Sequence, residues 1–187
     1  RQMCIRDSMF FDLWRAEGVD TQYVIREEGS QTGIYFISRT DAEHSFTYYR
    51  KDSAASHLQP TDLPYDYIAN AKILHTSGIS QAISSSVCSA VSRSIEIAKG
   101  SGALISYDPN IRLKLFDLKN FMGVVWETIG LVDFVLPSLE DAITFTGLKD
   151  PFQIVEKILA GGPKIVALKL GSEGVLMGTK ESIYSIP

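Results

Sequence analysis

The sequence of 187 residues has few of the patterns that mark specialised classes of protein. Its two cysteines, Cys4 and Cys88, form no Cys-x-x-Cys pair, so we expect neither a disulfide framework nor a cysteine-bound metal. The longest apolar stretch, residues 121–136, is interrupted by Glu127 and Asp133, whereas a membrane-spanning helix needs about 18 residues with few or no charges. These absences argue against a secreted scaffold and a membrane protein, and they favour a cytoplasmic protein with reduced thiols.

Clusters of charge of one sign are missing as well. The 18 lysines and arginines are scattered among 22 aspartates and glutamates, so neither nucleic acid nor a membrane surface is an expected partner. The three histidines, His44, His57 and His75, share no short metal-ligand spacing, and we predict no metal-ligating residues. No Gly-x-Gly-x-x-Gly follows a predicted strand, which disfavours a dinucleotide-binding dehydrogenase. The composition instead favours the chemistry of small molecules.

Strands and helices alternate from residue 72 onward. Short apolar runs typical of buried strands occur at 72–76, 103–108, 133–136 and 164–170. Helices are predicted between them at 84–99, 118–130, 140–146 and 152–159. A final hairpin is expected at 174–178 and 182–186. The alternation indicates parallel βαβ units, with helices covering both faces of the sheet.

The first part of the chain carries a different pattern. Residues 33–39 and 44–50 are rich in β-formers and are joined by a short polar link, which predicts a β-hairpin. Upstream, residues 10–16 are predicted to form the end of an amphipathic helix that is capped by Gly18. Residues 1–8 fit no predicted element and resemble a translated sequencing adapter. We therefore expect a non-native flank at 1–8 and a domain at 9–187 that is truncated at both ends.

Polar residues directly follow the predicted strand 103–108. Pro109 ends the strand, because proline has no N–H for the sheet, and Asn110 and Arg112 come just after it. Ligands of open α/β sheets bind at the carboxyl ends of the strands, where an arginine suits a phosphate or a carboxylate. Asp108 is typical of an aspartate that makes turn hydrogen bonds before a proline, so we leave it out of the site.

The hairpin carries a second group of candidate residues. Tyr48 and Arg50 are two positions apart on a strand and therefore project from the same face. Together they offer a hydroxyl and a guanidinium side by side, which suits an acidic ligand. The plain structural alternative is that Tyr48 and Tyr49 are strand formers and that Arg50 is a solvated charge.

The order of these segments resembles that of the ribokinase-like (PfkB) carbohydrate kinases. The matching segments are Gly33-Ile34-Tyr35, Tyr48-Tyr49-Arg50, His75-Thr76-Ser77-Gly78-Ile79, Asp108-Pro109-Asn110-Ile111-Arg112, Pro137-Ser138-x-x-Asp141 and Leu168-Lys169-Leu170-Gly171. The resemblance runs from about Phe10 to Pro187. It implies an α/β fold, a three-layer αβα ribokinase-like domain in which the hairpin at about 33–50 forms a small β lid over the sugar site.

The resemblance also implies roles for single residues. Those that would bind the sugar substrate are Tyr35, Tyr48, Tyr49, Arg50, Ile79 and Arg112. Those that would bind the nucleotide are Asn110, Arg112, Ser138, Lys169 and Gly171. Arg112 is the implied catalytic residue, because phosphoryl transfer spreads negative charge that a positioned guanidinium stabilises. ATP and Mg²⁺ are the implied cofactors.

Some positions depart from the family pattern. Ser138 and Asp141 stand where many relatives have Asn-x-x-Glu, an element tied to magnesium and phosphate. Ser138 is equally well explained as a helix N-cap, and both interpretations stay open. Lys169 either meets a partner at the end of its strand or reaches solvent. The Gly-Ala-Gly-Asp segment that supplies the family's general base does not occur in the sequence, so we expect this chain to be inactive by itself.

The implied activity is ATP-dependent phosphorylation of 2-dehydro-3-deoxy-D-gluconate at its 6-hydroxyl, since Arg50 suits the carboxylate of a sugar acid. Two alternatives stay open. The first is a kinase of a neutral sugar such as fructose or ribose, which offers no carboxylate to Arg50. The second is a non-catalytic sugar-binding protein that has kept the hairpin and lost the catalytic residues. A homo-oligomer is a further alternative, because the aromatic hairpin could pair with the hairpin of another subunit.

Overall fold

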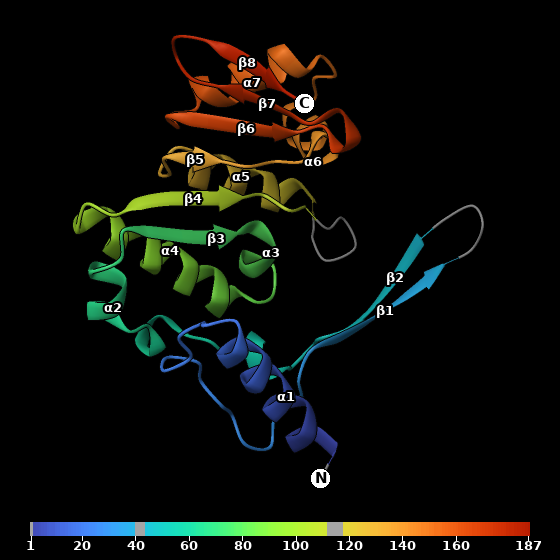
Figure 1. The fold of residues 1–187 in the computed structure, drawn as a ribbon, viewed down its shortest axis with the longest axis vertical. Helices are drawn as coiled ribbons and strands as arrows, with labels where there is room; N and C mark the ends of the chain where they lie inside the picture. Colours follow the sequence, from blue (N-terminus) through green and yellow to red (C-terminus); the bar gives the residue numbers. More distant parts are fainter. Residues whose placement is uncertain (1, 40–43, 112–117) are drawn as a thin grey trace. The chain divides into compact units, whose positions relative to one another are not determined.

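The computed structural model describes residues 2–39, 44–111 and 118–187 (Figure 1). These residues form two compact units, one up to Leu58 and one from Gln59 onward. None of the helices in the described part of the chain is long and apolar enough to cross a membrane.

The first unit contains a helix and the predicted hairpin. Helix α1 spans Gln2–Ala16, and the chain turns at Gly18 with a φ of 72°, as glycine readily does. Strands β1 (Ile34–Arg39) and β2 (His44–Tyr49) pair antiparallel, which confirms the hairpin. The link at 40–43 lies outside the described residues.

The start of α1 differs from the sequence interpretation. Residues 2–8 were expected to fit no element, but they continue the helix without a break. The reason is local, since no glycine or proline interrupts the sequence between Gln2 and Ala16. The non-native origin of the segment 1–8 is not tested by this geometry and stays a prediction.

The second unit is built on one six-stranded sheet whose order is β3-β4-β5-β6-β7-β8. The strands are β3 (Ile73–Ser77), β4 (Leu104–Asp108), β5 (Phe134–Val135), β6 (Ile165–Lys169), β7 (Val175–Gly178) and β8 (Ile183–Ile186). Strands β3 to β6 are parallel, while β7 and β8 form the predicted closing hairpin. The predicted α/β class is therefore confirmed.

Helices precede the first parallel strand and connect the parallel strands to one another. They are α2 (Tyr65–Ala69), α3 (Gly78–Gln81), α4 (Ser85–Gly100), α5 (Leu118–Ile129), α6 (Leu139–Thr146) and α7 (Pro151–Ala160), with 3₁₀ turns at Ala54–Ser56, Pro60–Asp62 and Gly171–Glu173. The short helix α3 was not expected from the sequence. It begins directly after β3 and carries Ile79.

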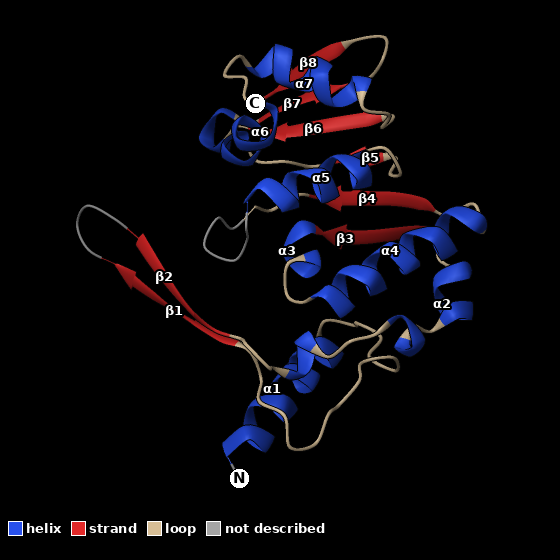
Figure 2. Cartoon of the chain, turned by 180° about the vertical axis from the view of Figure 1, so that it is seen from behind, coloured by secondary structure: helices blue, strands red, loops and turns tan. Residues whose placement is uncertain are grey.

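The helices α4 to α7 lie on one face of the sheet, behind the strands in Figure 1 and in front of them in Figure 2. The expectation of helices on both faces is therefore not met by the described residues, which form the sheet and one helical layer. The cause is the strand order. From β3 to β6 the strands follow one another without a reversal, and right-handed crossovers then place every connecting helix on the same side.

The two faces of the sheet differ in burial accordingly. On the helical face, Tyr107, Val135 and Val166 are fully buried. On the opposite face Ile73 is 54% exposed and Tyr184 is 61% exposed. The hydrophobic core of this unit thus lies between the sheet and the helices.

Gly78 brings the end of β3 against the turn that follows β4. A Cβ at this position would lie 2.0 Å from the carbonyl oxygen of Pro109 and 2.9 Å from the hydroxyl of Tyr107. The absence of a side chain at Gly78 therefore sets the spacing between two loops at the same edge of the sheet.

Gly78→Ala should lower the free energy of unfolding by about 1–3 kcal/mol, because the backbone of Pro109 must shift to admit the methyl group. Urea unfolding monitored by circular dichroism would measure the loss. Gly123→Ala is the matched control, since Gly123 is an exposed position of α5 with open space around it, and the variant should gain about 0.5–1 kcal/mol. Equal midpoints for Gly78→Ala and the parent would contradict the close approach.

Candidate functional site

The carboxyl ends of the four parallel strands meet at one edge of the sheet, as the shared direction of the β3, β4 and β6 arrowheads shows (Figure 1). This edge brings together Ser77, Asp108, Ser138 and Lys169. Lys169 also forms a parallel bridge with Ser138, and its N–H donates to the carbonyl of Pro137 at 2.9 Å. The edge expected from the sequence to bind a ligand is thus formed by residues far apart in the chain.

The turn after β4 is fixed by two carboxylates. The Oδ1 atom of Asp108 accepts a hydrogen bond from the N–H of Asn110 at 3.2 Å, and that of Asp141 accepts one from the N–H of Ile111 at 3.0 Å. Asn110 has a φ of 38°, an unusual value for a residue with a side chain, and asparagine tolerates it better than most. Arg112, the predicted catalytic residue, lies outside the described residues.

Lys169 does not simply reach solvent. Its Nζ lies 2.7 Å from Oδ2 of Asp108, and the two side chains are 45% and 22% exposed. Asp108 makes the turn hydrogen bond that the sequence suggested, and it also holds this ion pair, which was not predicted from the sequence. The sequence contained a sign of this ion pair, because Asp108 and Lys169 each lie at the end of a predicted strand. Whether the two side chains come into contact depends on the order of the strands in the sheet.

Of the two interpretations of Ser138, the structure forms the helix cap. Its Oγ accepts a hydrogen bond from the N–H of Asp141 at 3.1 Å, at the start of α6. The Oδ1 atom of Asp141 is engaged by Ile111. Among the described residues no three His, Cys, Asp or Glu side chains cluster closely enough to hold a metal ion. The described part of this edge is therefore not a preformed protein cage for Mg²⁺.

A buried polar chain holds α3 at the same edge. The hydroxyl of Tyr107 donates to Oε1 of Gln81 at 2.9 Å, and Nε2 of Gln81 donates to Oγ1 of Thr128 at 2.9 Å. All three residues are buried. Burial, together with the nearby charge of Asp108, raises the pKa of Tyr107 far above its usual range, so the phenol stays a donor. This chain fixes the helix that carries the predicted sugar contact Ile79, which is itself partly buried.

Two further residues lie at this edge. Gly171 follows β6 with a φ of 65°, a conformation that favours glycine, and it is exposed. Ser77, at the end of β3, has a buried Oγ without a hydrogen-bond partner among the described residues. Ser77 belongs to a segment that carries the family resemblance, but the resemblance implies no role for it.

The hairpin of the first unit separates the predicted sugar contacts into two groups. Tyr35 lies opposite Tyr48, with ring centroids 6.1 Å apart. Arg50 comes directly after β2, and its Cβ lies 3.3 Å from where a Cβ of Gly33 would be. Tyr49 lies opposite Ile34, and its ring packs against that of Phe36 at 5.6 Å. The structure thus pairs Tyr35 with Tyr48 on one face of the hairpin, and it places Tyr49 on the other face.

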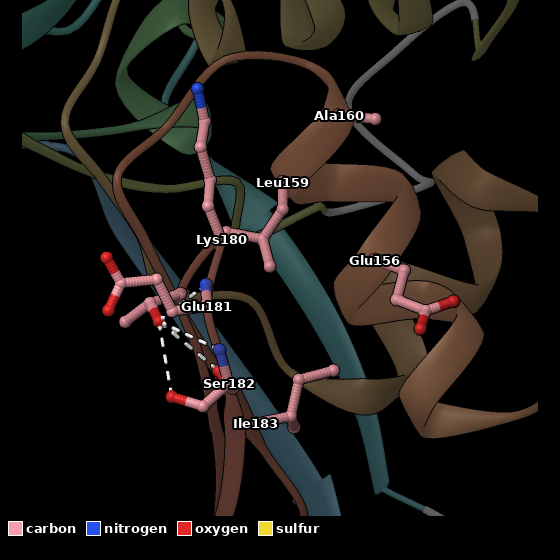
Figure 3. A pocket seen from close by; sticks show the side chains of 8 residues that line it. Glu156, Leu159, Ala160, Lys180, Glu181, Ser182 and Ile183 are labelled. Carbon is pink, nitrogen blue, oxygen red and sulfur yellow. Dashed lines mark hydrogen bonds between the residues drawn. The ribbon is translucent and has the colours of Figure 1, made fainter.

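A separate cavity of about 380 Å³ lies elsewhere in the second unit (Figure 3). It is lined by residues of α7 and of the turn between β7 and β8, namely Glu156, Leu159, Ala160, Thr179, Lys180, Glu181, Ser182 and Ile183. Because β7 runs antiparallel to β6, this turn lies at the edge where the parallel strands begin. The cavity contains none of the residues predicted from the sequence.

The fold and the edge site define a ribokinase-like α/β protein. The solved structure of a PfkB protein from Polaromonas sp. JS666 is 27% identical, with a TM-score of 0.88 over 96% of this chain and 61% of that one. A protein described as ribokinase II from E. coli, solved in complex with ATP and Mg²⁺, has a TM-score of 0.82 over 96% of this chain and 57% of that one; at 23% identity this likeness shows the fold alone.

The chain belongs to the pfkB family of carbohydrate kinases, whose family model matches residues 7–187. It is 34% identical to 2-dehydro-3-deoxygluconokinase of Bacillus subtilis over 90% of this chain and 53% of the relative. It is 39% identical to the probable fructokinase-3 of Arabidopsis thaliana over 92% of this chain and 51% of the relative. The chain thus spans about half the length of these relatives.

Ser138→Ala should lower the free energy of unfolding by about 1 kcal/mol, because the N–H of Asp141 loses its acceptor at the start of α6. Ser138→Asp should retain most of the stability, since an aspartate also caps a helix. Thermal unfolding of both variants beside the parent would measure the difference. An unchanged Ser138→Ala variant would show that the cap contributes little.

Proposed function

We propose that this chain is part of a cytoplasmic carbohydrate kinase that transfers the γ-phosphoryl group of MgATP to the 6-hydroxyl of 2-dehydro-3-deoxy-D-gluconate. One observation carries the phosphoryl-transfer part. The turn with Asn110 and the end of β6 with Lys169 share one sheet edge and are joined by Asp108. The family of carbohydrate kinases to which the chain belongs provides the reaction class.

Each residue at this edge has a proposed task. Lys169 and Asn110, with the exposed Gly171 beside them, would contact the nucleotide phosphates, and Arg112 would stabilise the charge that develops on the transferred group. Ser138 would act through its position at the N-terminus of α6, where backbone N–H groups favour an anion. Mg²⁺ would neutralise phosphate charge and keep most of its water ligands.

The choice of a sugar acid rests on the hairpin. Tyr35 and Tyr48 share one face of the hairpin, and Arg50 is two positions after Tyr48. By the two-residue period of a strand, a guanidinium and two phenol groups would then be presented to one ligand. An arginine beside a carboxylate forms a charge-assisted hydrogen bond, which a neutral sugar does not offer. The similarity to a 2-dehydro-3-deoxygluconokinase agrees with this choice.

A kinase of fructose is the second candidate, because the chain is also 39% identical to a probable fructokinase. A coupled assay of ADP release would decide between the two substrates. The full-length protein would be offered MgATP with 2-dehydro-3-deoxy-D-gluconate, fructose or ribose separately. Turnover of the sugar acid alone supports the proposal, turnover of a neutral sugar replaces the substrate, and no turnover favours a non-catalytic sugar-binding protein.

The 187-residue chain alone should show no turnover in the same assay. Its sequence contains no Gly-Ala-Gly-Asp segment, and we propose that the general base lies outside these residues. ADP release by the purified chain, dependent on an added sugar, would contradict this expectation.

Arg50→Ala in the full-length protein should lower kcat/KM for the sugar acid on the order of 10- to 100-fold, the value of a hydrogen bond to a charged group. The same variant should change kcat/KM for fructose little. Arg93→Ala is the matched control, because Arg93 is an exposed arginine of α4 paired with Glu96. An equal, small effect of Arg50→Ala on both sugars would show that Arg50 does not contact the carboxylate.

A further inference from the structure

Asp108 touches two of the residues proposed to contact the nucleotide. One carboxylate oxygen lies 2.7 Å from Nζ of Lys169, and the other accepts the N–H of Asn110 at 3.2 Å. Both oxygens of one side chain are thus used at the same time, on two different elements of the sheet edge. The function proposed above uses Asp108 only as a link between these two elements and gives it no task in nucleotide binding.

The contact with Lys169 crosses a strand. β4 and β6 both pair with β5, so they are not neighbours, and their separation is about 9–10 Å at the usual strand spacing. Ser106, Phe134 and Ile165 are partners across the three strands, which places Asp108 and Lys169 on the same face of the sheet. Because β5 has only two residues, a long lysine side chain can reach across it.

The stability that this ion pair provides is small. Lys169 is 45% exposed, and ion pairs this accessible to water add little to the free energy of unfolding. What the pair does change is freedom of movement. A lysine side chain whose ammonium group is held has already lost most of its rotamer freedom. It therefore loses less conformational entropy when it binds a phosphate.

We propose that Asp108 is a positioning residue, which holds the Lys169 ammonium and the Asn110 backbone in a fixed arrangement for the phosphates of the nucleotide. This inference rests on the proposed function, and it assigns the arrangement of the phosphate contacts to one side chain. Asp141 supports the same turn one residue further on, through the N–H of Ile111.

A second aspartate of the same sheet provides a matched control. Oδ1 of Asp133 lies 2.7 Å from Nζ of Lys164, and Oδ2 accepts the N–H of Ile105 at 2.8 Å. Its side chain is 19% exposed, close to the 22% of Asp108. This pair has the same chemistry but lies at the opposite edge, where the parallel strands begin. Burial raises the pKa of Asp133, but the hydrogen bonds from Lys164 and Ile105 outweigh it and the pKa is lowered.

The test is titration calorimetry of MgADP binding to the full-length protein and to Asp108→Ala, Lys169→Ala, the double variant and Asp133→Ala. We expect Asp108→Ala to weaken MgADP binding at least tenfold. The double variant should bind MgADP within twofold of Lys169→Ala, because each single change already disrupts the same arrangement of Asp108 and Lys169. Asp133→Ala should bind MgADP within twofold of the parent while losing thermal stability.

The Asp108→Asn variant separates the two contacts of Asp108. An asparagine keeps an oxygen for the N–H of Asn110 but loses the charge opposite Lys169, so KM for MgATP should rise while KM for the sugar stays unchanged. MgADP binding by Asp108→Ala equal to that of the parent overturns the inference and leaves the proposed function standing. A parent protein that binds no adenine nucleotide overturns both.

Discussion

Parallel strands joined by right-handed crossovers end at the same edge of their sheet, and in this chain the edge collects the ends of β3, β4, β5 and β6. The position of each candidate residue that the structure describes in the second unit depends on this alignment. Asp108 and Lys169 are 61 positions apart, yet they meet because each ends a strand on the same face. The same rule places all the connecting helices on one side, which buries one face of the sheet and leaves apolar side chains such as Ile73 exposed on the other.

The surroundings of this edge are stiffened by polar contacts that water does not reach. Gln81 uses both ends of its amide, one to Tyr107 and one to Thr128, so three elements are joined by side chains that would be costly to leave unpaired. Gly78 adds a direct contact between two backbones. Ile79 therefore belongs to a short helix, α3, that the hydrogen bonds of Gln81 hold in place. Rigid support of this kind is what precise placement of a ligand requires.

Much of the fold could be predicted from local patterns. Pro109 marked the end of β4, and apolar periodicity placed the other strands within two residues, because these signals act between neighbours in sequence. The one-sided helical layer and the Asp108 ion pair could not be predicted, since both follow from the order of strands in the sheet. Tyr49 illustrates a different difficulty. Its position between Tyr48 and Arg50 already placed it on the opposite face by the two-residue period of a strand, but the family resemblance grouped all three.

The brevity of β5 has a consequence for how this family can vary its sequence. The two residues of β5 separate β4 from β6 in the sheet. Only Leu136 and Pro137 lie between the end of β5 and Ser138, the N-cap of α6. An insertion in the segment 136–138 would lengthen β5 or displace the N-cap of α6. In either case it would change the distance between Asp108 and Lys169, whose side chain reaches across β5. Relatives that accept insertions elsewhere in their loops should therefore keep a constant length here, and a change in length would have to be accompanied by different residues at positions 108 and 169.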